Sequence, residues 1–313
     1  MNREVNTDQH NKPLDIPVLL MVFNRMDSAK QVFNAIKKAQ PTKLYIACDG
    51  PRSHKENEKE KVTALREYLM SQIEWPCEIK TLFRENNLGC KLAVSGAIDW
   101  FFSQEPMGII LEDDCLPSES FFWFCRELLL RYKDDSRIWQ ISGFNMQDGK
   151  HRTNDHYFFS HFGFSWGWAS WSRAWAHFDV EMKLWPIAKK ENIINTYPLM
   201  PSRYVTWEET YNGKIDTWDY QWYFAMASNS ALSIVPTRSM IKNIGFGPEA
   251  THTFNDISGR GKIENHDISF PLTHPNFVIY NREYETALLK QVNSEYNLIN
   301  RIKNRIRRLL GKV

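Results

Sequence analysis

The amino-acid sequence predicts an α/β protein with a mostly parallel central sheet flanked by helices. Short apolar runs of strand length alternate with amphipathic helical segments in the first part of the chain, a pattern typical of parallel sheets with right-handed crossovers. The runs are continuous rather than alternating, as expected for strands buried on both faces. Each run ends in polar or charged residues, which places the chemistry at the edge of the sheet where open α/β proteins bind ligands.

The elements up to residue 143 can be placed in order from their apolar spacing. The first apolar run ends in Asn24-Arg25, and the following helix is expected to use Asp27 or Ser28 as its N-cap. The predicted strands cover residues 16–23, 43–48, 77–83, 107–111 and 138–143, and the later predicted helices cover 55–71, 90–102 and 118–133. No Gly-x-Gly-x-x-Gly or P-loop follows any strand, which argues against a dinucleotide or P-loop enzyme.

The second part of the chain has a different pattern. A segment dense in Gly, Ser and Trp is followed by two segments that we expect to be helical, then by a further helix and a strand. In order, these are residues 158–175, 174–185, 187–210, a helix ending at residue 228, and 232–236. No repeat or low-complexity linker divides the chain. We therefore expect a loosely ordered N-terminus (1–15), one large domain (16–285) with two halves (16–145 and 146–285), and a basic amphipathic helix (296–313).

Composition and charge exclude some classes of function and indicate the cellular setting. The 313 residues are 42% hydrophobic and 24% charged, as in a globular protein, and the net charge of +2 argues against a nucleic-acid partner. Five cysteines without zinc-ligand spacing and the lack of a signal peptide or a long apolar run indicate a reduced, cytoplasmic setting. The basic helix at 296–313 suits the anionic inner face of a plasma membrane, or docking on its own domain.

Three consecutive carboxylates, Glu112, Asp113 and Asp114, follow the apolar strand 107–111. Like charges crowded at a strand end require a counter-charge, and Mg²⁺ or Mn²⁺ prefers carboxylate and phosphate oxygens. The alternative is a turn followed by a helix N-terminus, where acidic residues are also favoured.

Other polar residues follow the neighbouring strands. Arg25 follows the first strand, Asp49 the second and Asn87 the third, so all converge with the acidic triplet on one edge of the sheet. Together they offer an acceptor for a base or ribose, a cation for a diphosphate and a metal site. The aromatic residues of the 158–175 segment, Trp166 and Trp168 among them, could stack on a sugar or fill the core.

Several motifs resemble the glycosyltransferases of the GT-A fold, and in particular the inverting N-acetylglucosaminyltransferase I family. That family has a Glu-Asp-Asp motif followed by a Phe-Phe helix, then Gly-x-Gly-Trp, Trp-Pro, Trp-Asp-Asp-Trp and Thr-Phe-Gly landmarks. The matching segments here, in the same order, are 111–122, 163–168, 185–186, 218–219 and 245–247, and the turn at 86–89 resembles an Asn-x-Gly turn of broader GT-A enzymes.

The resemblance implies roles for single residues. Asp114 matches the acid that coordinates the metal, while Glu112 and Asp113 match acids that contact the donor sugar and ribose. Arg25 matches an arginine that meets the diphosphate, and Asp49 an aspartate that contacts uracil.

The catalytic base is implied at Asp219, which lies in the segment that matches Trp-Asp-Asp. Because the second Asp of that motif is Tyr220 here, Asp216 and Glu209 remain alternative bases. His252 is either a further metal ligand, as in many GT-A enzymes, or a surface residue.

These roles imply a metal-dependent inverting glycosyltransferase of the hexosyl- or N-acetylhexosaminyl class. Its donor would be a nucleotide-sugar, UDP-linked by the resemblance, and its acceptor a cell-surface glycan or a lipid-linked glycan precursor. Two alternatives stay open, a sugar-phosphate nucleotidyltransferase and a catalytically silent carbohydrate-binding protein of the same fold. The sequence carries no indication of the oligomeric state.

Overall fold

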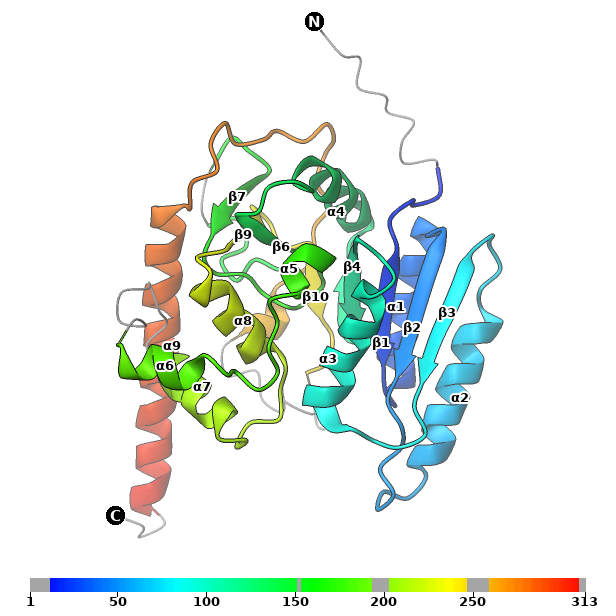
Figure 1. The fold of residues 1–313 in the computed structure, drawn as a ribbon, viewed down its shortest axis with the longest axis horizontal. Coiled ribbons are helices and arrows are strands. Elements are labelled where there is room, and N and C mark those ends of the chain that lie inside the picture. Colours follow the sequence, from blue (N-terminus) through cyan, green and yellow to red (C-terminus); the bar gives the residue numbers. More distant parts are fainter. Residues whose placement is uncertain (1–11, 151–152, 193–202, 247–258, 310–313) are drawn as a thin grey trace, which may run out of the picture.

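The computed structural model describes residues 12–150, 153–192, 203–246 and 259–309, with side chains described as far as residue 295. Within these ranges eight strands form one sheet, and its spatial order is β3 (Glu78–Phe83), β2 (Lys43–Cys48), β1 (Val18–Val22), β4 (Met107–Glu112), β8 (Trp168–Trp171), β6 (Ile138–Ser142), β9 (Leu232–Pro236) and β7 (Tyr157–Ser160). Strand β8 is antiparallel to both neighbours and β7 is antiparallel to β9, while the other pairs are parallel. The predicted α/β class is confirmed, since this large Rossmann-like sheet is flanked by helices (Figure 1).

Successive strand residues point to opposite faces of the sheet, and helices cover both faces. The inner strands β1, β2 and β4 are therefore buried on both sides, whereas the edge strand β3 is only partly buried. In β1, Val18, Leu20 and Val22 join one buried cluster and Leu19 and Met21 join another. The first cluster is completed by α1 (Met26–Ala39), α2 (Glu58–Ser71) and α4 (Glu119–Arg131), and the second by α3 (Gly89–Phe102), α5 (Ser172–Trp175) and α8 (Asp219–Ser228). The continuous apolar runs of the sequence are thus explained by the two layers of helices.

The start of α1 differs from the prediction. The helix begins at Met26 with Arg25 in the N-cap position, and no side chain caps it, so neither Asp27 nor Ser28 does. The connection from β1 is therefore only three residues long. This short connection holds Arg25 at the carboxyl end of β1, where its side chain meets acidic partners.

The aromatic segment forms strands that the sequence did not predict. Strands β7 and β8 are buried along their whole length, and β8 lies between β4 and β6 in the middle of the sheet. The predicted helix at 174–185 is wrong, because the side chain of Asp179 accepts hydrogen bonds from the amides of Glu181 (3.1 Å) and Lys183 (2.7 Å) and closes a turn. Of the predicted helix at 187–210, the structure has α6 (Trp185–Lys190) and α7 (Arg203–Tyr211), and residues 193–202 lie outside the described residues.

A second, two-stranded sheet brings a late segment of the chain to the acidic triplet. Strand β5 (Cys115–Pro117) pairs with β10 (Ile241–Asn243) in antiparallel orientation, with Asn243 opposite Cys115. The chain continues from β10 past Asp114 and later forms the short helix η3 (Arg260–Lys262). This pairing positions Gly245 beside the triplet.

The C-terminal helix α9 (Arg282–Leu309) begins well before residue 296, where the sequence predicted an amphipathic helix. Its buried residues in the part with described side chains are Tyr284, Glu285, Leu288 and Val292. Glu285 accepts hydrogen bonds from the Ser160 hydroxyl (2.9 Å) and the His161 amide (2.7 Å), which fastens the start of α9 to β7. In the part of the chain that the structure describes, no helix combines the length and apolar character needed to cross a membrane.

Candidate functional site

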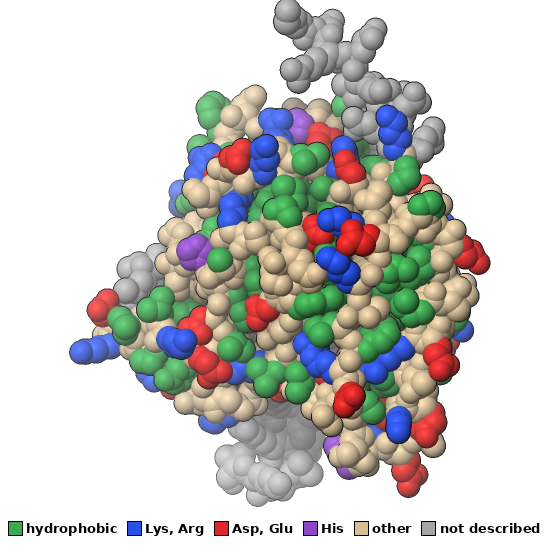
Figure 2. Space-filling view, turned by 45° about the vertical axis from the view of Figure 1, so that its right-hand side comes forward, with side chains coloured by type: hydrophobic (Ala, Val, Ile, Leu, Met, Phe, Trp, Pro, Cys, Tyr) green, Lys and Arg blue, Asp and Glu red, His purple; other side chains and the backbone are tan. Residues whose placement is uncertain are grey.

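A cavity of about 550 Å³ opens at the carboxyl ends of β1, β2 and β4. Its wall combines the strand ends, the first turns of α3 and the segment 215–220 that precedes and begins α8. Figure 2 shows acidic and basic side chains beside one another on one face of the molecule, among apolar and uncharged groups. The predicted residues that line the cavity are Arg25, Asp49, Asn87, Glu112, Asp113, Asp114, Trp166 and Asp219.

Arg25 bridges two carboxylates of the acidic triplet. Its Nη2 lies 2.6 Å from Asp113 Oδ1 and its Nη1 lies 3.0 Å from Asp114 Oδ2. Asp113 is 3% exposed, and its second oxygen accepts a hydrogen bond from the amide of Phe23 (3.2 Å). Burial opposes the charge of Arg25, but Asp113 and Asp114 outweigh it and raise the pKa of Arg25. For Asp113, burial disfavours the charged form and raises the pKa, and the positive charge of Arg25 acts in the opposite direction.

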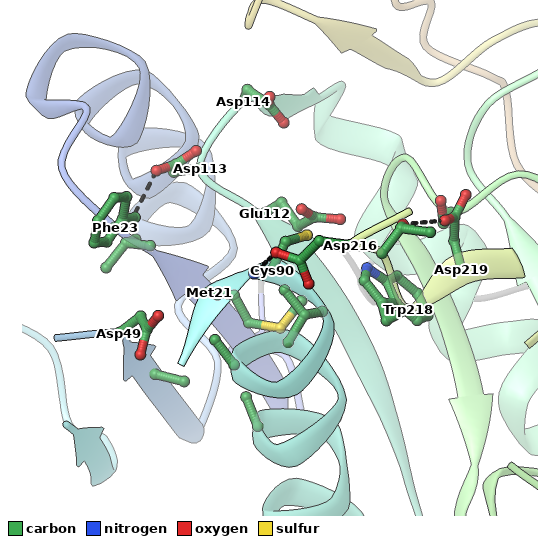
Figure 3. A pocket seen from close by; sticks show the side chains of 18 of the residues that line it. Met21, Phe23, Asp49, Cys90, Glu112, Asp113, Asp114, Asp216, Trp218 and Asp219 are labelled. Atoms are coloured by element: carbon green, nitrogen blue, oxygen red, sulfur yellow. Dashed lines mark hydrogen bonds between the residues drawn. The ribbon is translucent and has the colours of Figure 1, made fainter. Parts of the chain in front are cut away.

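Glu112 is the member of the triplet without such support. Among the described residues the structure gives its carboxylate no hydrogen bond and no ion pair, and the residue faces the cavity (Figure 3). Burial, followed by the charges of Asp114, Asp113 and Asp219, raises the pKa of Glu112. An unpaired carboxylate crowded by three others is the kind of site that a cation stabilises.

Gly245 closes the site over the ion pair. The Ile244 amide donates to the carbonyl of Asp114 (2.8 Å), and the Gly245 amide donates to Asn243 Oδ1 (2.8 Å). A Cβ atom on Gly245 would lie 2.2 Å from Asp114 Oδ2 and 2.8 Å from Arg25 Nη1. Because heavy atoms cannot approach so closely, only glycine fits here without moving the ion pair.

Asp49 holds a turn of the chain in place. Its two carboxylate oxygens accept hydrogen bonds from the amide of Leu88 (3.1 and 3.0 Å), and Asn87 Nδ2 donates to Oδ2 (2.9 Å). Burial raises the pKa of Asp49, and the hydrogen bond from Leu88 opposes this change. The oxygens that were predicted to contact uracil are therefore engaged in fixing the Asn-Asn-Leu-Gly turn.

Asp219 lies across the cavity from Asp49, with Glu112 between them in the view of Figure 3. It is the first residue of α8, and its Oδ1 accepts a hydrogen bond from the hydroxyl of Thr217. The preceding residue, Trp218, is 2% exposed and stacks on Trp168, with ring centroids 5.6 Å apart and an interplanar angle of 20°. The core thus anchors the backbone beside Asp219, while one carboxylate oxygen remains available to a ligand.

The two alternative bases are placed differently. Asp216 lines the cavity, but its oxygens accept hydrogen bonds from the amides of Cys90 (3.1 Å) and Lys91 (3.0 Å) at the start of α3. Glu209 is on α7 and does not line the cavity. Asp219 is therefore the best placed of the three to contact a ligand in the cavity.

The two tryptophans predicted to contact substrate also separate. Trp166 lines the cavity, and its ring centroid lies 4.7 Å from that of Phe144 and 6.0 Å from that of Phe246. Trp168 is 1% exposed and belongs to the apolar core, so its predicted contact with a nucleotide-sugar does not agree with its position. Its orientation follows from strand alternation in β8, which the sequence did not reveal. His252 lies outside the described residues.

Sequence reasoning missed other residues of the wall, including Arg52, Arg84, Cys90, Thr217 and Asn243. Arg84 follows β3 just as Arg25 follows β1, so its position at a strand end was the signal that could have identified it. Cys90 lies near several carboxylates, and burial together with the charges of Glu112, Asp216 and Asp219 raises the pKa of its thiol. It is therefore a neutral, apolar part of the wall.

The described residues contain no group of three or more His, Cys, Asp or Glu side chains arranged to hold a metal ion by themselves. A divalent cation in a nucleotide enzyme commonly uses one or two carboxylates and takes its other ligands from phosphates and water. Asp114 and Glu112, which both line the cavity, fit this kind of partial site. Six carboxylates and three guanidinium groups line the cavity, so its own charge also favours an added cation.

Comparison with known proteins finds no family model and no curated protein that matches this chain. Among solved structures, 4-diphosphocytidyl-2C-methyl-D-erythritol synthase from Anaerococcus prevotii DSM 20548 is similar, with 7% identity, a TM-score of 0.33, and coverage of 52% of this chain and 73% of that chain. HddC from Yersinia pseudotuberculosis has 8% identity, a TM-score of 0.30, and coverage of 50% and 77%. Similarities this low do not bear on the reaction of this chain.

Proposed function

We propose that this protein is a metal-dependent, inverting glycosyltransferase of the GT-A type that uses a UDP-linked sugar. One observation carries the proposal. A single cavity combines the Arg25-bridged acidic triplet at the ends of β1 and β4 with a carboxylate, Asp219, on a different wall. A nucleotide-sugar has a negatively charged diphosphate beside its reacting carbon. Arg25 and the acidic triplet could bind the diphosphate with a cation, and Asp219 could accept the proton of the group that attacks the carbon.

In the proposed reaction, Asp219 accepts the proton of an acceptor hydroxyl while that oxygen attacks the anomeric carbon. The bond between the anomeric carbon and the diphosphate oxygen breaks on the opposite side, and the configuration inverts. The bonding electron pair leaves with the nucleoside diphosphate. Thr217 holds Asp219 Oδ1, so the other oxygen receives the proton.

Arg25 lies where it can bind the leaving diphosphate, since guanidinium groups form paired hydrogen bonds with phosphate oxygens. Asp114, together with Glu112, would hold Mn²⁺ or Mg²⁺, and a bound cation would stabilise the negative charge that develops on the leaving group. Trp166 and the turn containing Asn87 supply further wall for the nucleotide-sugar.

We infer that the acceptor is a hydroxyl of a glycan or a lipid-linked glycan precursor, and that the protein acts at the inner face of the plasma membrane. The basic sequence of the end of α9 supports this placement, because lysine and arginine side chains are attracted to anionic lipids.

A sugar-phosphate nucleotidyltransferase is the rival, since a cavity with an arginine and metal-binding acids would also suit that reaction. Such enzymes usually bind a triphosphate with a glycine-rich basic loop after the first strand. Here three residues, Phe23, Asn24 and Arg25, connect β1 to α1, and the arginine is paired with two carboxylates. This geometry favours glycosyl transfer.

The test measures nucleoside diphosphate release from a panel of nucleotide-sugars, with and without Mn²⁺, and pyrophosphate release from nucleoside triphosphates with sugar phosphates. We expect diphosphate release that requires Mn²⁺ and falls at least 100-fold in Asp219→Asn and in Asp114→Asn. Asp134→Asn, an exposed substitution away from the cavity, is the control. Pyrophosphate release would establish the rival, and no turnover with any donor would indicate a silent binding protein. Unchanged transfer in Asp219→Asn would exclude Asp219 as the base.

A further inference from the structure

The start of α3 is capped by a residue from a distant part of the chain. Leu88 occupies the N-cap position of the helix but provides no side-chain hydrogen bond. Asp216 supplies it, because its Oδ2 accepts from the Cys90 amide at 3.1 Å (Figure 3) and its Oδ1 accepts from the Lys91 amide at 3.0 Å. Two amides that would otherwise lack a partner are thereby satisfied.

The fit between the two segments depends on Gly89. Its φ of +77° is unfavourable for other residues, and a Cβ atom there would lie 2.9 Å from Asp216 Oδ2. The glycine therefore permits both the turn into α3 and the close approach of the Asp216 carboxylate. The two halves of the cavity wall meet at this point.

The segment that carries Asp216 also carries the proposed base. Trp218, two residues later, is held in the core by stacking on Trp168, and Thr217 donates its hydroxyl hydrogen bond to Asp219. We call the part of the cavity wall formed by the strand ends and the first turns of α3 the donor wall. The segment is thus fixed to the donor wall through Asp216 and to the core through Trp218. Asp219 follows directly after these two attachments as the first residue of α8.

We propose that Asp216 is a positioning residue, which fastens the segment carrying Asp219 to the N-terminus of α3 and thereby sets where the base stands relative to the donor wall. The proposal rests on the proposed function for the role of Asp219, but the attachment itself does not. Both Asp216 oxygens accept main-chain amides, so the residue acts as a hydrogen-bond acceptor rather than as a base. A side-chain amide can accept one of these bonds, because asparagine is as good an N-cap residue as aspartate.

The test compares Asp216→Asn, Asp216→Ala and Asp219→Asn in the full chain. We expect Asp216→Asn to retain kcat within about 3-fold, whereas Asp216→Ala loses about 10- to 100-fold in kcat, as expected for a displaced catalytic group, with little change in KM for the donor. The acid limb of the pH profile of kcat should stay in place in Asp216→Ala, because the base is unchanged. If Asp216→Asn falls as far as Asp219→Asn, or if Asp216→Ala keeps full activity, the proposal is wrong.

Amide hydrogen exchange tests the attachment without any turnover. We expect the Cys90 and Lys91 amides to exchange at least 10-fold faster in Asp216→Ala than in the unmodified chain, and Asp216→Asn to restore most of the protection. Unchanged exchange in Asp216→Ala would overturn the attachment. If the chain shows no glycosyl transfer at all, the proposed function fails, and the exchange measurement still decides whether Asp216 joins the two segments.

Discussion

Replacing Arg25 by methionine tests how much the ion pairs of Arg25 with Asp113 and Asp114 contribute to the stability of the fold. Asp113 is 3% exposed and Arg25 is its cationic partner, so Arg25→Met leaves a buried carboxylate with only the amide of Phe23. Removing one member of a buried ion pair costs about 3–5 kcal/mol. The side chains of Arg25 and Asp114 are 22% and 15% exposed, which reduces the cost, and we expect the free energy of unfolding to fall by about 3 kcal/mol.

Arg126→Met is the matched control, because Arg126 pairs with Asp15 at the surface, where the two side chains are 25% and 56% exposed. Exposed pairs contribute less than about 1 kcal/mol. The assay is equilibrium unfolding in urea with a metal chelator present, followed by tryptophan fluorescence. Arg25→Met combined with Asp113→Asn should recover at least about 1 kcal/mol, because the unpaired charge is gone. Equal losses for Arg25→Met and Arg126→Met would refute the reasoning.

Three further predictions concern Gly245, the ion pair between Arg52 and Glu58, and the C-terminal tail. Gly245→Ala should lower the free energy of unfolding by about 1–3 kcal/mol and weaken UDP binding in calorimetry, because a Cβ atom there meets Asp114 at 2.2 Å; unchanged binding would contradict this. The hydrogen bond from Arg52 lowers the pKa of Glu58, so this ion pair stabilises the fold above the ordinary glutamate pKa and is lost as the pH falls through the lowered value. In urea unfolding, Glu58→Gln should therefore differ most from the unmodified chain near neutral pH and least once the pH is below the lowered pKa of Glu58. Deletion of residues 296–313 should abolish sedimentation with anionic vesicles but leave the thermal midpoint within a few degrees, since the shortened chain keeps Tyr284, Leu288 and Val292, which pack α9 against the core; persistent sedimentation would exclude the tail as the anchor.

Most strands of the main sheet were predictable where they are buried on both faces, although the edge strand β3 is only partly buried. Continuous apolar runs bounded by charged turns specify such strands closely, and β2 and β9 have the predicted bounds. Strand β8 carries three aromatic or small residues and a serine without a clear alternation, so its place between β4 and β6 depends on pairing with distant strands. Helix propensity also suggested a helix at 174–185, where the Asp179 side chain forms a turn instead.

The candidate site was predictable where it depends on strand ends and was not where it depends on the approach of distant loops. The order of the strands is enough to bring Arg25, Asp49 and the acidic triplet to one edge. Spacing in the sequence does not show that Asp216 reaches α3, more than 120 residues away, or that Trp168 points into the core. These positions are set by side-chain packing across the sheet, which a single sequence does not encode in any local pattern.

In the proposed reaction, Arg25 couples binding of the nucleotide-sugar to binding of the cation. Its guanidinium occupies Asp114 Oδ2, so a cation arriving at Asp114 competes with it for that oxygen. The phosphate oxygens of a nucleoside diphosphate offer Arg25 another anionic partner, and its departure leaves Asp114 to the cation. Each ligand thus removes the obstacle to the other, and we expect UDP to bind at least 10-fold more tightly with Mn²⁺ than without it in calorimetry. Equal affinities would mean that Arg25 stays on Asp114 when the donor binds.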